Sequence, residues 1–72
     1  MDRRIRITTT DVANAIRGWK KSNGGQAPTF NDLLAILRCN PHDLMEELEK
    51  AEQVQAIYEP SLGHYDIVPG ML

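Results

Sequence analysis

Apolar residues recur at helical spacing in three segments of the chain. Val12, Ile16 and Trp19 stand at positions i, i+4 and i+7, which places them on one side of a helix. Two further stripes consist of Phe30, Leu33, Leu34 and Leu37, and of Leu44, Leu48 and Ala51 with Met45 at its edge. The spacing predicts helices over residues 10–22, 29–38 and 41–52, with these apolar side chains, Trp19 and Phe30 included, in the core.

Polar and turn-forming residues mark the ends of these segments. Thr8, Thr9 and Thr10 offer hydroxyls that can cap the first helix, and the pair Gly24-Gly25 ends it. Thr29 with Asp32 three residues later resembles a capping box. Asn40 followed by Pro41 is typical of an N-cap with proline in the first turn. Only two or three residues then separate the second and third helices, which is the geometry of a helix-turn-helix.

The chain after the third helix predicts a β-hairpin. Residues 54–59 and 64–68 are expected as strands around the four-residue turn 60–63, with Tyr58 and Tyr65 pairing across them. Residues 4–8 also alternate between polar and apolar types, so they could add a short third strand. The predicted fold class is α+β: a three-helix winged helix-turn-helix domain over residues 10–68, after a basic arm (1–9) and before a flexible tail (69–72).

Three short motifs resemble known winged-helix families. Residues 24–30, Gly-Gly-Gln-Ala-Pro-Thr-Phe, resemble the "G-x-x-P-T" passage into the second helix of the LexA repressor DNA-binding domain, and Asn40-Pro41-His42 resembles the "S-P-N" start of its recognition helix. Residues 48–54 are similar to the "L-E-K-A-G-L-V" passage from recognition helix to wing in MarR-type regulators. The chain departs from that motif where Glu52 and Gln53 replace Gly and Leu, so the helix is expected to end differently or to run one residue longer.

The resemblance implies a small DNA-binding protein, a transcriptional regulator that reads double-stranded DNA with helix 41–52. On this interpretation the residues facing the bases are Asn40, His42, Asp43, Met45 and Glu46. The resemblance also implies phosphate contacts from the basic residues around that helix, with His64 contributing from the wing. These basic residues are Arg3, Arg4, Arg6, Lys20, Lys21 and Arg38.

The charge distribution leaves a second function open. The net charge is −2, whereas nucleic-acid-binding domains are usually basic. Residues 1–36 carry six cations against three acids, and residues 37–72 carry two against seven. Five of those acids lie in helix 41–52 beside the single cation Lys50. The same helix could therefore bind a basic protein surface, as in a phage or plasmid protein that engages host machinery.

Other chemistry is weakly represented in the sequence. Cys39 has no second cysteine for a disulfide and is expected as a small buried residue in a reducing, cytoplasmic setting. Cys39, His42 and His64 lack the spacing of a zinc site, and Cys39 with His42 lacks the third group that orients a catalytic pair. No metal, cofactor or enzymatic activity is therefore expected. No apolar run is long enough to span a membrane. A DNA-binding module of this size would need a larger partner or a second copy, as in a homodimer.

Overall fold

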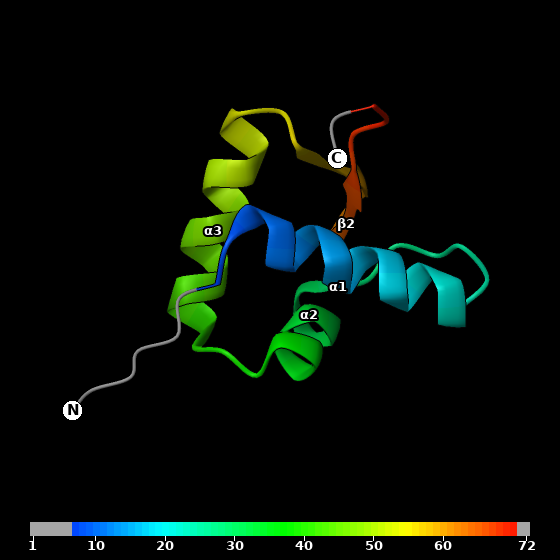
Figure 1. Cartoon of the computed structure of the whole chain (residues 1–72), viewed down its shortest axis with the longest axis horizontal. Helices are drawn as coiled ribbons and strands as arrows, with labels where there is room; N and C mark the ends of the chain where they lie inside the picture. Colours follow the sequence, from blue (N-terminus) through cyan, green and yellow to red (C-terminus); the bar gives the residue numbers. More distant parts are fainter. Residues whose placement is uncertain (1–6, 71–72) are drawn as a thin grey trace.

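The structure, a computed structural model, describes residues 7–70. Three helices, α1 (Thr9–Ser22), α2 (Phe30–Leu37) and α3 (Pro41–Gln53), precede an antiparallel hairpin of β1 (Ile57–Ser61) and β2 (His64–Ile67) (Figure 1). This order confirms the predicted α+β, winged-helix architecture. The expectations for residues 1–6 and for 71–72 lie outside the described residues.

Side-chain caps begin all three helices. The Thr8 hydroxyl accepts a hydrogen bond from the Asp11 amide at 3.2 Å, and the Asp11 carboxylate accepts from the Thr8 amide at 2.9 Å. Thr29 and Asp32 form the same reciprocal pair before α2, at 3.2 and 3.0 Å. Asn40 accepts from the amide of His42 at 2.7 Å before α3. These caps satisfy amides that have no partner inside the helix, which fixes where each helix begins.

A sharp corner separates α2 from α3, as the sequence predicts. Arg38 takes the left-handed conformation with φ of 52°, and its amide donates to the carbonyl of Leu34 at 2.8 Å. This bond closes the last turn of α2. The chain then turns directly into the Asn40 cap, so α3 starts as a separate helix.

The end of α3 agrees with the expectation drawn from Glu52 and Gln53. The helix continues to Gln53, one residue beyond the boundary at residue 52, and Val54 caps it instead of opening a strand. The left-handed residue is Gln55, with φ of 60°. The amides of Gln55 and Ala56 donate to the carbonyls of Glu52 and Ala51 at 3.0 and 2.8 Å, the bonding of a Schellman motif. Gln55 therefore occupies the position where glycine is usual.

The strands of the hairpin are shorter and its turn is tighter than predicted. Only Leu62 and Gly63 lie between the strands, and Gly63 supplies the positive φ of 82° that the turn requires. The expected pairing of Tyr58 with Tyr65 is wrong. The register places Tyr58 opposite Asp66, so the two tyrosines point to opposite faces of the sheet. Tyr65 packs against the core, whereas Tyr58 is exposed.

A short third β segment is present, but it precedes α2. Thr29 forms an isolated antiparallel bridge with His64, and the amide of Tyr65 donates to the carbonyl of Pro28 at 2.9 Å. Ile7 and Thr8, the described part of the segment proposed for this role, are in no strand. The link between α1 and α2 therefore covers the free edge of β2.

The core joins all three helices to the base of the hairpin. The predicted stripes are confirmed except for Trp19, and β1 and the chain before it add Ile57 and Ala56. Phe30 is half-buried and packs against this cluster. Trp19 is only half-buried and lies outside the cluster, contrary to prediction. Trp19 belongs to the last turn of α1, and this end of the helix extends past the other two helices (Figure 1). The buried cluster consists of Val12, Ala15, Ile16, Leu33, Leu44, Leu48, Ala51, Ala56 and Ile57.

Candidate binding face on the third helix

One side of α3 faces the core, and the rest of the helix surface faces solvent. Leu44, Leu48 and Ala51 are buried, and they repeat at the spacing of a single helical face. Apart from the partly buried Glu47, the residues beside them are exposed and mostly charged: His42, Asp43, Met45, Glu46, Glu49, Lys50 and Glu52.

The structure brings the five predicted base-reading residues together on the N-terminal half of α3. All five, Asn40, His42, Asp43, Met45 and Glu46, are exposed, and Met45 has 53% of its surface accessible. Two of them already contact one another, because His42 Nε2 lies 3.1 Å from Glu46 Oε2. Asn40 uses its side-chain oxygen as the helix cap. These four polar side chains would therefore present mainly acceptor groups to a partner.

A groove runs between the start of α1 and the outward surface of α3. Residues 7–9 form one wall, and α3 forms the other. The α3 wall carries four carboxylates and a single ammonium group. Its residues are Asp43, Glu46, Glu47, Glu49, Lys50 and Gln53.

Glu47 differs from the other acids of this wall. Its side chain is only 12% exposed, and its Oε2 accepts a hydrogen bond from the Thr9 hydroxyl at 2.9 Å. Lys50 approaches its other oxygen at 3.8 Å. Glu47 therefore joins α3 to the first turn of α1. Its position three residues after the buried Leu44 was the sequence signal for this partial burial.

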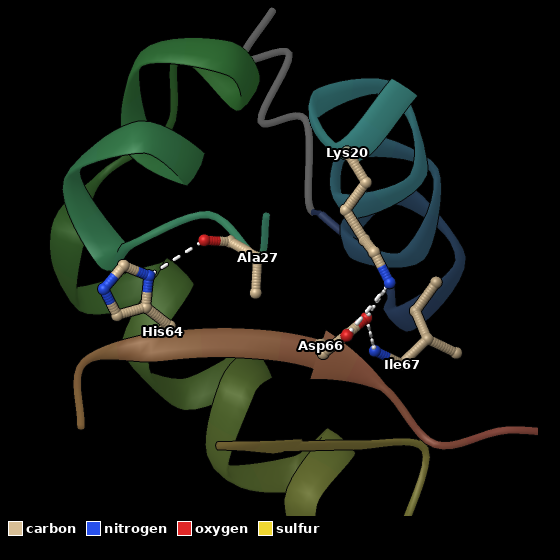
Figure 2. A network of polar contacts seen from close by, with 5 residues as sticks. All are labelled: Lys20, Ala27, His64, Asp66 and Ile67. Carbon is tan, nitrogen blue, oxygen red and sulfur yellow. Dashed lines mark hydrogen bonds and ion pairs between the residues drawn. The ribbon is translucent and has the colours of Figure 1, made fainter. Parts of the chain in front are cut away.

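Lys20, a predicted phosphate contact, forms an internal ion pair. Figure 2 shows its ammonium group pointing from α1 onto β2, where Nζ lies 3.0 Å from both carboxylate oxygens of Asp66. Asp66 Oδ1 also accepts from the Ile67 amide at 2.7 Å. The two side chains are 34% and 16% exposed. Lys20 would have to leave this pair before it could contact a phosphate.

His64, the predicted wing contact, is also engaged internally. Its Nδ1 lies 2.9 Å from the carbonyl oxygen of Ala27, which requires the proton to be on Nδ1 (Figure 2). The residue is half-buried at the start of β2. The tip of the wing is instead occupied by Leu62, which is 96% exposed.

The remaining predicted phosphate contacts are dispersed. Arg38 is exposed at the corner just before α3. Lys21 is exposed in the last turn of α1. That helix starts beside α3 at Thr9 and runs away from it (Figure 1), so Lys21 lies about 18 Å further along its axis. Arg3, Arg4 and Arg6 lie outside the described residues.

Cys39 and the histidines do not assemble a reactive centre. Burial raises the pKa of the Cys39 thiol, a backbone hydrogen bond partly opposes this, and the charge of Asp43 raises it further. An activated cysteine instead requires surroundings that lower the pKa of its thiol. Within residues 7–70 no group of three or more His, Cys, Asp or Glu side chains is placed to hold a metal ion.

No protein-family model matches the chain, and neither a curated protein nor a solved structure is significantly similar to it. Among the described helices none has the length and apolar character needed to cross a bilayer. Residue chemistry and geometry are therefore the basis for proposing a function.

Proposed function

We propose that this winged-helix domain binds a basic segment of a partner protein in the acidic groove beside α3. The observation that carries the proposal is the composition of that groove, whose α3 wall has four carboxylates and one ammonium group. In the alternative, DNA binding, the same surface would have to approach a phosphate backbone. The two functions therefore predict opposite responses to added positive charge on α3.

The electrostatics favour a basic partner. Phosphate contacts supply most of the affinity of a DNA-binding domain, and lysine and arginine side chains make those contacts. Here Lys20 is paired with Asp66 and His64 with Ala27, while Asp43, Glu46 and Glu49 stand exposed. Each exposed ion pair with a partner would contribute at most about 1 kcal/mol. A field of one sign over a groove nevertheless accelerates association and selects partners of the opposite sign.

The experiment is affinity capture from a lysate of the source organism, with bound proteins identified by mass spectrometry. The bait is the full chain, compared with the double variant Glu46→Lys/Glu49→Lys and with Lys21→Glu as the matched charge-reversal control. We expect one basic partner to be retained by the wild type and by Lys21→Glu, and to be lost with the double variant. Retention of every bound protein by the double variant would contradict the proposal.

DNA binding is the second candidate, and the corner before α3 favours it. The corner exposes Asn40, His42 and Met45 on the first turns of the helix beside the exposed Arg38, the layout with which helix-turn-helix proteins enter the major groove. The test is an NMR titration with a random-sequence DNA duplex at low salt. Shifts at α3 amides that weaken steeply with salt and shrink in Arg38→Ala would establish this function in place of the first. No shift at α3 would exclude it.

A further inference from the structure

A second, shallow groove lies where the C-terminal end of α3 meets the base of the hairpin. This second groove shares no lining residue with the acidic groove beside α3. The lining of the second groove combines apolar and aromatic side chains with an amide and two carboxylates. Its lining residues are Glu52, Gln55, Ile57, Tyr58, Glu59 and Val68.

The aromatic ring and the carboxylates of this groove are open to a ligand. Tyr58 is 42% exposed, because the register turns it away from the core face of the sheet. Glu52 is exposed at the end of α3. Glu59 accepts from the Gly63 amide through Oε2 at 2.9 Å, which leaves its Oε1 for a partner. The groove thus combines the partly exposed Val68, an exposed aromatic ring and two acids.

Both carboxylates line this groove, Glu52 from the end of α3 and Glu59 from β1. The Schellman turn through Gln55 brings the end of α3 back beside β1, so acids from two elements converge at this groove.

We propose that this groove accepts an arginine side chain of the basic partner, an inference that rests on the proposed function and names a contact for it. The methylene stem of an arginine would lie on the partly exposed Val68, since long cationic side chains cover apolar surface with their stems. Its guanidinium would stack on the ring of Tyr58. Its fork of N–H donors would meet the carboxylates of Glu52 and Glu59. Lysine has the charge but neither the plane nor the fork, so the groove discriminates between the two cations.

The test is an NMR titration of the full chain with three capped tripeptides, Gly-Arg-Gly, Gly-Lys-Gly and Gly-citrulline-Gly, at low ionic strength. We expect Gly-Arg-Gly to shift the amides of Gln55 and Tyr58 and the ring protons of Tyr58. We expect it to bind at least threefold more tightly than Gly-Lys-Gly. The citrulline peptide keeps the shape without the charge and should cause no saturable shift.

Substitutions distinguish arginine binding in this groove from binding in the acidic groove beside α3. Glu52→Gln should weaken the binding of the arginine peptide at least threefold. Tyr58→Leu should remove the difference in affinity between the arginine and the lysine peptide. Gln26→Lys raises the net charge by the same one unit at an exposed position outside both grooves, and it should leave the binding of both peptides unchanged. Equal binding of arginine and lysine peptides, or shifts centred on α3 near Glu46, would overturn the inference while leaving the proposed function standing. Peptide-independent shifts at Tyr58 that grow with protein concentration would overturn it in favour of a second copy of the chain.

Discussion

Lys20 Nζ lies 3.0 Å from each carboxylate oxygen of Asp66, and this contact ties the last turn of α1 to strand β2. The pair joins residues 46 positions apart in the sequence. It also explains why a lysine next to the exposed Lys21 is half-buried. A cation that the sequence assigns to DNA contact is thus part of the wing's attachment to the helices.

The first prediction concerns this ion pair. A double-mutant cycle with Lys20→Met and Asp66→Asn should give a coupling of about 0.5–1 kcal/mol in the free energy of unfolding at low salt, because the pair is partly shielded from water. Urea denaturation measures it. Lys21→Met, which removes the neighbouring exposed charge, should change stability by less than about 0.5 kcal/mol. Additive effects of Lys20→Met and Asp66→Asn would show that the contact contributes nothing.

The second prediction concerns the turn after α3. Gln55 holds a positive φ, a conformation that costs an L-residue roughly 1 kcal/mol and that glycine adopts freely. Gln55→Gly should therefore raise the free energy of unfolding by about 0.5–1 kcal/mol despite the greater entropy of the unfolded glycine. In contrast, Gln53→Gly, inside the helix end, should lower it by a similar amount. Thermal unfolding of the two variants measures both effects. If both substitutions lower the free energy of unfolding, the backbone at Gln55 is not strained.

The third prediction compares two adjacent residues of α3. Leu44 is fully buried, whereas Met45 is 53% exposed. Leu44→Ala should cost about 2–5 kcal/mol through lost burial and the cavity left behind. A small domain has little stability beyond that, so this variant should be largely unfolded by circular dichroism. Met45→Ala should stay folded and within about 1 kcal/mol of the wild type. If both substitutions lowered the free energy of unfolding by similar amounts, α3 would have to be rotated about its own axis relative to the core.

The fourth prediction is a loss of stability at alkaline pH through Tyr65. Its pKa is raised in the folded protein, first by burial and then by Glu59 and Glu52. The folded state therefore keeps the phenol proton that the unfolded state releases near pH 10. This contribution is fully present below about pH 10 and is lost as pH rises through the folded pKa. Urea midpoints of the wild type should fall more steeply there than those of Tyr65→Phe.

Tyr58→Phe is the control for that measurement, since it removes the exposed phenol of the same hairpin. The other ionisable groups are the same in the proteins compared, so they do not account for a difference between the pH curves. Parallel pH curves for the wild type and Tyr65→Phe would show that deprotonation of Tyr65 does not oppose folding.

Much of the fold could be predicted because it is encoded locally. A capping box such as Thr29 with Asp32 needs only neighbouring residues, and apolar spacing marks the buried side of each helix. The misplaced boundaries have a different cause. The end of α3 depends on bonds from Gln55 and Ala56 back to the helix, and a non-glycine residue in that position carries no clear sequence signal.

The candidate site was only partly predictable for a related reason. The sequence showed that helix 41–52 is acidic, and the structure keeps Asp43, Glu46 and Glu49 exposed. The sequence could not show that the Glu47 side chain turns towards Thr9. Nor could it show that α1 carries Lys21 away from α3, because that depends on how the helices cross.

By itself the sequence determined three helices, their caps, the corner between the second and third, and the hairpin, because each follows from neighbours within a turn or a strand. Only the tertiary structure decided which charges face a partner and which are paired with one another. Lys20 with Asp66 and His64 with Ala27 are separated by 46 and 37 residues, and no local pattern specifies contacts at that range. Side-chain charge is a property of the sequence, but its availability to a partner depends on packing.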